Sequence, residues 1–96
     1  MTKYRAAEEY CFRRSWRLRC RREDVRWLVR LAVDHLPDQP PNCREQHEEW
    51  HANIEDQLTK AVQQECGNPL VVWLLLNVIV PIVVKLVIAW WLNRKE

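Results

Sequence analysis

The sequence predicts an all-α protein in which an N-terminal antiparallel helical hairpin is followed by one C-terminal transmembrane helix. Residues 69–92 read PLVVWLLLNVIVPIVVKLVIAWWL and contain a single charged side chain, Lys85. Residues 2–36 contain neither Pro nor Gly, as expected of a long helix. The segment PDQPPN at 37–42 holds three prolines, which end one helix before the next begins.

These boundaries divide the chain into three parts. We expect residues 1–68 to form the extramembrane hairpin, residues 69–92 to cross a membrane and residues 93–96 to form a short basic tail. Residues 1–33 carry 10 Lys or Arg against 4 Asp or Glu, whereas residues 34–68 carry 2 against 8. Segments of opposite charge favour folding onto each other, and the basic segment can also attract phosphate on anionic lipid or on nucleic acid.

The first helix is expected over residues 3–36, with apolar side chains on two faces. One stripe at helical spacing comprises Ala7, Cys11, Leu18, Val25, Val29, Ala32 and Leu36. A weaker stripe on the other side comprises Phe12, Trp16, Cys20, Trp27 and Leu31. The helix also carries a run of eight arginines, Arg13, Arg14, Arg17, Arg19, Arg21, Arg22, Arg26 and Arg30. One hairpin partner cannot cover so much apolar surface, so a neighbouring protein, a second copy or the membrane interface is expected to cover the rest.

The second helix is expected over residues 43–66. Its apolar positions form a narrow stripe of Trp50, Ile54, Leu58, Ala61 and Val62. We expect this stripe to pack antiparallel against Leu18, Val25 and Val29 of the first helix, with its acidic residues near the arginines. A turn at Gly67, in the left-handed conformation, then leads into the third helix at Pro69.

The third helix has the length and flanking residues of a membrane span. Its 24 residues extend about 36 Å at a rise of about 1.5 Å each, against a hydrocarbon core of about 30 Å. The expected interface anchors are Trp73, Trp90, Trp91, Arg94 and Lys95. A core helix of a soluble domain is the alternative, and we disfavour it because 96 residues provide little protein to surround so apolar a helix.

A polar stripe runs along this predicted membrane span. Asn77, Pro81 and Lys85 recur every four residues and therefore share one side of the helix. Polar groups in hydrocarbon are costly, so we expect this side to contact a protein partner. The alternative is that Lys85 extends its side chain to the headgroups.

The cysteines and histidines predict little chemistry. A hairpin brings Cys11 level with Cys66, which allows a disulfide, but reduced thiols are favoured because nothing indicates an oxidising compartment. Cys43, His47 and His51 are weak candidates for metal ligands, since three side chains over two helical turns cannot all reach one ion. Ordinary surface histidines explain the spacing equally well, and no metal or other cofactor is expected.

The chain shows no phosphate-binding loop, nucleophile elbow or zinc-protease motif, so we expect a protein without enzymatic activity. The predicted role is that of a single-pass, tail-anchored accessory or structural subunit of a larger membrane assembly, with lipid and other subunits or itself as partners. The alternatives are a holin-like oligomer that permeabilises membranes, and a membrane-tethered binder of anionic lipid or, less favoured, of nucleic acid. Because a tail of four residues crosses a membrane more easily than a long charged segment, the N-terminal part is expected on the cytoplasmic side.

Overall fold

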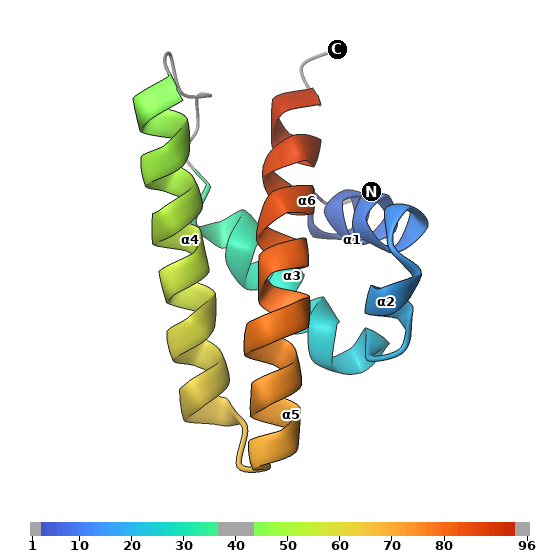
Figure 1. Cartoon of the computed structure of the whole chain (residues 1–96). Coiled ribbons are helices and arrows are strands. Elements are labelled where there is room, and N and C mark those ends of the chain that lie inside the picture. The colour runs from blue at the N-terminus through green and yellow to red at the C-terminus, as the bar shows by residue number, and fades with distance from the viewer. Residues whose placement is uncertain (1–2, 37–43, 94–96) are drawn as a thin grey trace.

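The computed structural model describes residues 3–36 and 44–93, and every element within them is helical. The elements are, in chain order, α1 (Lys3–Arg14), α2 (Trp16–Arg19), α3 (Arg22–Asp34), α4 (Arg44–Glu65), α5 (Pro69–Leu74), the π-helical turn η1 (Leu75–Ile79) and α6 (Val80–Asn93). The all-α prediction with a C-terminal apolar helix is therefore confirmed. We refer to α5, η1 and α6 together as the C-terminal rod, because they follow one another without a break (Figure 1).

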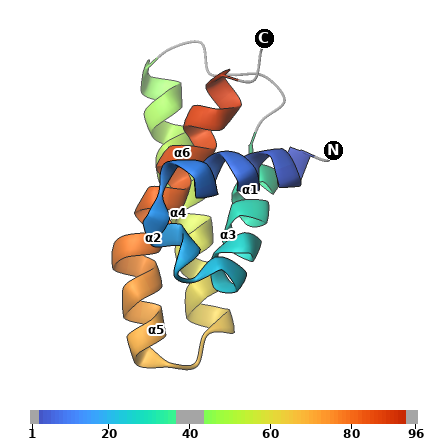
Figure 2. The same ribbon diagram turned by 90° about the vertical axis from the view of Figure 1, so that its right-hand side faces the viewer.

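The C-terminal rod occupies the middle of the molecule. The chain turns after α4, and the rod returns alongside it in the opposite direction (Figure 1). On the other side α1 lies across α6, and α3 contacts both α6 and α4 (Figure 2). The predicted hairpin core between the first two helices thus differs from the structure, in which the rod contacts α1, α3 and α4.

The single helix expected over residues 3–36 is divided into three. Ser15 has an extended backbone, with φ −142° and ψ 112°, and Arg21 leaves the helical region with φ −128° and ψ 42°. Six arginines fall between positions 13 and 22 without an acidic residue, and like charges three or four residues apart disfavour a continuous helix. A straight helix of this length would extend about 50 Å, whereas the molecule measures 39 Å along its longest axis.

The breaks let both apolar segments of the N-terminal part reach the same helix. The stripe prediction is confirmed at the level of burial, since Ala7 and Cys11 on α1 and Val25 and Val29 on α3 are fully buried. Their core also includes Leu18, Leu28, Ile54, Leu58, Val62, Leu75, Val83, Val84 and Val87. Each large side chain in this set contributes roughly 1.5–3 kcal/mol by leaving water.

Side chains complete the corner between α1 and α3. Arg19 Nε donates a hydrogen bond of 2.8 Å to the carbonyl of Phe12, one of the last carbonyls of α1. Arg21 Nη2 lies 2.6 Å from Asp24 Oδ2 in the first turn of α3. At the opposite ends of these helices the Tyr4 hydroxyl donates to the Asp34 carboxylate, and this hydrogen bond raises the pKa of Tyr4. Arg19 and Arg21 of the basic run therefore stabilise the turns between α1 and α3.

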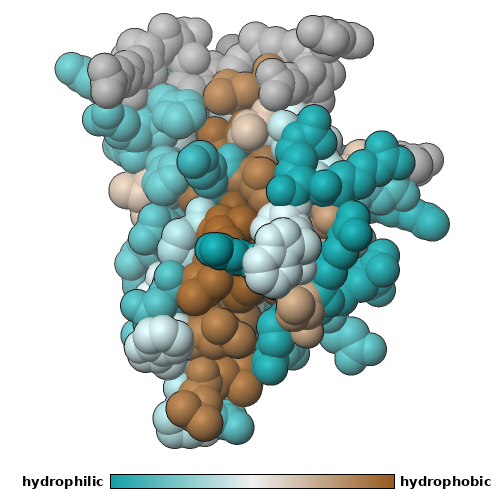
Figure 3. Space-filling view, turned by 45° about the vertical axis from the view of Figure 1, so that its right-hand side comes forward, coloured by the Kyte–Doolittle hydropathy of each residue, from teal (hydrophilic) through white to brown (hydrophobic). Residues whose placement is uncertain are grey.

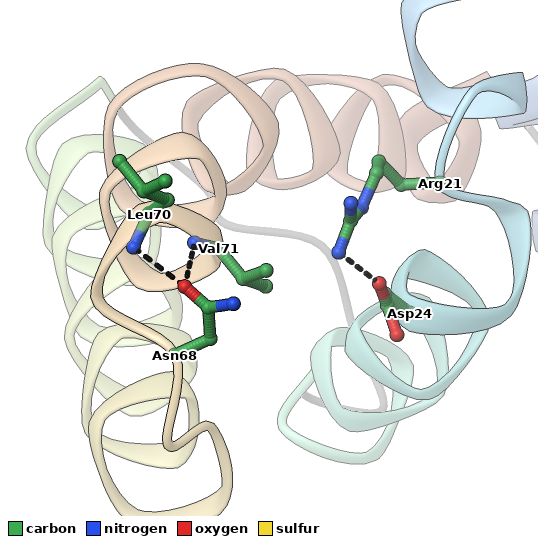
Figure 4. A network of polar contacts seen from close by, with 5 residues as sticks. All are labelled: Arg21, Asp24, Asn68, Leu70 and Val71. Carbon is green, nitrogen blue, oxygen red and sulfur yellow. Dashed lines mark hydrogen bonds and ion pairs between the residues drawn. The ribbon is translucent and has the colours of Figure 1, made fainter.

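The turn between α4 and the rod depends on Asn68. Its Oδ1 accepts hydrogen bonds from the backbone N–H groups of Leu70 at 2.9 Å and Val71 at 3.5 Å (Figure 4). Pro69 occupies the first helical position. The expectation for Gly67 is wrong, because no glycine among the described residues has a positive φ. The side-chain cap at Asn68 begins the new helix without a left-handed residue before it.

Candidate functional site

The most unusual surface of the molecule lies on the C-terminal rod. Residues Pro69–Leu92 form a helix long and apolar enough to cross a membrane, with a mean hydropathy of 2.7 in its most apolar window. The core helix of a soluble protein can be equally long and apolar, but it is mostly buried. Here only 39% of the most apolar 18-residue stretch is buried. The rod therefore has one side against protein and one side open.

The open side carries large apolar side chains. Leu70 is 81% exposed and Trp73 is 62% exposed, and Leu92 is also exposed near the far end. Figure 3 shows a hydrophobic band along the molecule, crossed near its middle by a hydrophilic side chain and bordered by hydrophilic side chains on either side. Leu74, Leu76, Val78, Ile82 and Leu86 are half-buried along the rod. We call this surface the apolar band, defined by Leu70, Trp73, Leu74, Val78, Ile82, Leu86 and Leu92.

The predicted polar stripe lies on the open side of the rod. Asn77, Pro81 and Lys85 are all exposed, as expected of residues that share one side of a helix. Asn77 Nδ2 donates a hydrogen bond of 2.8 Å to the carbonyl of Trp73, one turn earlier. The amide thus has one partner within its own helix.

Pro81 explains the π-helical turn that precedes it. Pro lacks an N–H, and its ring would press on the carbonyl four residues earlier, at Asn77. Over Leu75–Ile79 the helix widens, and the Val80 N–H donates to the carbonyl of Leu75, five residues back. The wider turn makes room for the proline without ending the helix.

The tryptophans predicted as interface anchors have different surroundings. Trp73 is exposed, whereas Trp90 and Trp91 are buried in the core. Arg94 and Lys95 lie outside the residues that the structure describes. In this arrangement one end of the rod is covered by protein and the other end presents its aromatic ring outward.

The arginine run does not form one basic face. Arg14 stacks on Tyr10, with its guanidinium carbon 3.6 Å from the ring centroid, and Arg13 and Arg17 are exposed. Arg19 and Arg21 stabilise the corner described above. Arg22, Arg26 and Arg30 instead line the groove between α1 and α3. The break of the helix therefore separates the arginines into groups with different surroundings.

Glu8 is the residue that the sequence analysis missed. It is 8% exposed, and Arg30 Nε and Arg26 Nε lie 3.3 and 3.7 Å from its Oε1. The sequence does indicate that Glu8 is partly covered. It follows the stripe residue Ala7 and precedes Cys11 by three positions, which places it beside the buried face. Only the reversal of α1 over α3 brings it to arginines 18 and 22 positions away.

The three cysteines in the described part of the chain are free thiols and differ in exposure. Cys11 is buried, Cys66 is half-buried and Cys20 is exposed, and the structure forms no disulfide between Cys11 and Cys66. Burial raises the pKa of the Cys11 thiol to about 12, against a smaller lowering effect of Arg14. Cys11 packs in the core, while Cys66 borders a separate groove beside Trp27 and Leu31.

The metal candidates gain no support from the described residues. Cys43 lies outside them, and His51 Nδ1 is 3.7 Å from Glu55 Oε2 on the next turn of α4. Across residues 3–36 and 44–93, no three His, Cys, Asp or Glu side chains are grouped as a metal site. His47 and His51 are half-buried side chains of one helix.

Comparison of the chain with protein-family models, with curated proteins and with solved structures gives no match.

Proposed function

We propose that this chain is a small, non-enzymatic, single-pass membrane protein that acts as an accessory or structural subunit of a larger membrane assembly. The observation that carries the proposal is the apolar band. Its exposed large apolar side chains, Leu70, Trp73 and Leu92, leave apolar surface of the rod in water, and soluble monomers rarely expose large apolar patches. Lipid or a protein partner in the bilayer would cover that surface.

The polar stripe supports a partner rather than lipid alone. An anchor needs neither Asn77 nor Lys85, since leucine at these positions would insert more readily. Both residues lie on the side of the rod that α1, α3 and α4 leave open. A neighbouring transmembrane helix on that side could hydrogen-bond the Asn77 amide and pair with the Lys85 ammonium.

Membrane insertion would also free the faces of the N-terminal helices that now contact the rod. Ala7 and Cys11 on α1 and Leu28 and Val29 on α3 are fully buried here and would need a new apolar surface. We infer that in the membrane-bound form α1 and α3 keep their contact with each other and that their freed faces pack on α4 or on another subunit. In this proposal the N-terminal part lies on the cytoplasmic side.

The experiment is mild-detergent extraction of the full chain from membranes, followed by mass measurement under native conditions. The proposal expects a complex of defined stoichiometry with other membrane proteins. Homo-oligomers without other proteins would instead support the holin-like alternative. Recovery of the chain from the aqueous fraction as a monomer would contradict membrane residence and make the rod the core helix of a soluble bundle.

A further inference from the structure

A groove between α1 and α3 is lined by residues of these two helices and not by the C-terminal rod. It has a volume of about 730 Å³, within the range of small-ligand sites. The residues that line it are Arg5, Glu8, Glu9 and Phe12 of α1 and Arg22, Arg26 and Arg30 of α3. Four guanidinium groups and two carboxylates leave this groove with a formal charge of +2.

The three arginines of α3 are placed by helical spacing. Arg22, Arg26 and Arg30 recur every four residues, so they form one row along the side of α3 that faces α1. Equal charges so close together repel one another unless an anion lies between them. Glu8 supplies one negative charge against this row.

The contacts of Glu8 with Arg26 and Arg30 leave other N–H donors of these two arginines able to bind a ligand. Glu8 Oε1 is approached by Nε of Arg30 at 3.3 Å and by Nε of Arg26 at 3.7 Å. Each guanidinium carries four further N–H donors on its two Nη atoms, in a planar fork that matches phosphate oxygens. The side chains of Arg26 and Arg30 are 48% and 59% exposed, so a solute can reach them.

The third arginine of the row rests on an aromatic side chain. The Arg22 guanidinium carbon lies 5.1 Å from the centroid of the Phe12 ring. Phe12 is itself buried, so its ring is a fixed support for this contact. The row is therefore held at two points, at Phe12 and at Glu8, which reduces the ordering that a ligand would have to impose.

We propose that this groove binds a phosphate group, and that Arg22, Arg26 and Arg30 are its ligands. A phosphate monoester carries close to two negative charges at neutral pH, which matches the charge of the groove. The group can be a free phosphate or the headgroup of an anionic lipid. The inference goes beyond the proposed function, because it depends on α1 and α3 and applies wherever the rod resides.

The first test is titration of the full chain, in a neutral detergent, with inorganic phosphate, followed by calorimetry. We expect saturable binding at one site, weakened about tenfold by Arg30→Gln and by Arg26→Gln, since each removes a charge-assisted hydrogen-bonding fork. Arg13→Gln and Arg17→Gln are matched controls, because they remove the same charge from exposed positions outside the groove lining. These controls should change the dissociation constant by less than about twofold.

Two further variants separate a binding site from a structural ion pair. Arg30→Lys keeps the charge that faces Glu8 but loses the planar fork, and we expect it to weaken phosphate binding severalfold while the helical content is unchanged. Glu8→Gln keeps an oxygen acceptor for Arg26 and Arg30 but removes the negative charge that competes with phosphate, so it should tighten phosphate binding. Lack of phosphate binding by the wild-type chain, or equal weakening by the groove and control variants, would overturn the proposal.

Vesicles identify the source of the phosphate. Phosphatidylcholine vesicles with and without phosphatidic acid are compared for the wild type and for Arg30→Gln. A preference for phosphatidic acid that Arg30→Gln abolishes supports the lipid headgroup. Equal vesicle binding by both proteins, with inorganic phosphate still bound about tenfold more weakly by Arg30→Gln, supports a free phosphate. Binding of a single-stranded oligonucleotide that falls equally in the groove and control variants, in place of saturable phosphate binding, would show general charge attraction and contradict the site.

Discussion

Asn77 Nδ2 donates a hydrogen bond of 2.8 Å to the backbone carbonyl of Trp73, one turn earlier on the same open side of the C-terminal rod. The bond satisfies one amide donor within the helix, while the second N–H and the amide oxygen keep further hydrogen-bonding capacity. Since this side also carries Pro81 and Lys85, the polar groups of the rod are gathered where α1, α3 and α4 do not contact it. The triple substitution of this stripe is therefore the sharpest test of a partner.

Replacing Asn77, Pro81 and Lys85 together by Leu should keep the protein in the membrane but detach it from its partner. The substitution removes the polar groups that a lipid-facing helix does not need, and with them the contacts to a neighbouring helix. Co-purification in mild detergent, with the partner-to-chain ratio as the readout, measures the effect. A control with Leu at Val71 and Val72, which are half-buried and outside the apolar band, should retain the partner. An unchanged ratio in the stripe variant would remove the stripe from the proposed interface.

Leu58→Ala should destabilise the fold far more than Trp50→Ala. Leu58 is fully buried, so its truncation should lower the free energy of unfolding by about 2–5 kcal/mol. Trp50 is half-buried and borders a groove that it shares with Gln46, Glu49 and Asn53, so its truncation should cost only about 1 kcal/mol. Denaturant unfolding of the two variants gives both values, and a larger loss for Trp50→Ala would place its ring in the core instead.

Cys20 should react with a maleimide at pH 8 while Cys11 stays protected. The thiolate is the reactive form, and burial raises the pKa of Cys11 to about 12, whereas Cys20 is exposed. Because the folded pKa of Cys11 lies above its unfolded value of 9.0, its contribution to stability is present below pH 9 and is lost as the pH rises toward 12. Peptide-level mass spectrometry reads the labelling, and equal rates for Cys11 and Cys20 in the folded protein would contradict the packing of α1.

The N-terminal part should be protected from protease in right-side-out vesicles and digested in inside-out vesicles. Residues 1–66 carry twelve Lys and Arg, and positively charged segments are favoured on the cytoplasmic side of a membrane. Fragments are read by mass spectrometry, and detergent permeabilisation provides the control. Digestion of residues 1–66 in intact right-side-out vesicles would reverse the orientation.

The sequence predicted which residues are buried better than what they contact. Ala7, Cys11, Val25 and Val29 were assigned to one stripe from helical spacing, and all four are buried. The packing of α1 and α3 against α6 could not be read from spacing, because periodicity identifies an apolar face and not the element that covers it. The breaks at Ser15 and Arg21 were missed because no Pro or Gly marks them, and the repulsion within the arginine run acts without a breaker residue.

The groove between α1 and α3 could not be predicted from the sequence, because periodicity does not show which helices pack together. Arg22, Arg26 and Arg30 could be placed on one side of a helix from their spacing. Their proximity to Glu8 requires α1 to fold back over α3, which makes a contact 22 residues apart in the chain. A continuous helix over residues 3–36 would have kept Glu8 about 33 Å from Arg30.

Alkaline carbonate extraction of membranes from cells that produce the full chain tests the membrane assignment of Pro69–Leu92 most directly. Carbonate releases proteins held by charge or by other proteins and leaves spanning helices in the bilayer. A spanning rod should keep the chain in the membrane pellet until mild detergent solubilises it. Release of the chain into the carbonate supernatant would contradict this expectation and would assign the rod to the core of a soluble helical bundle.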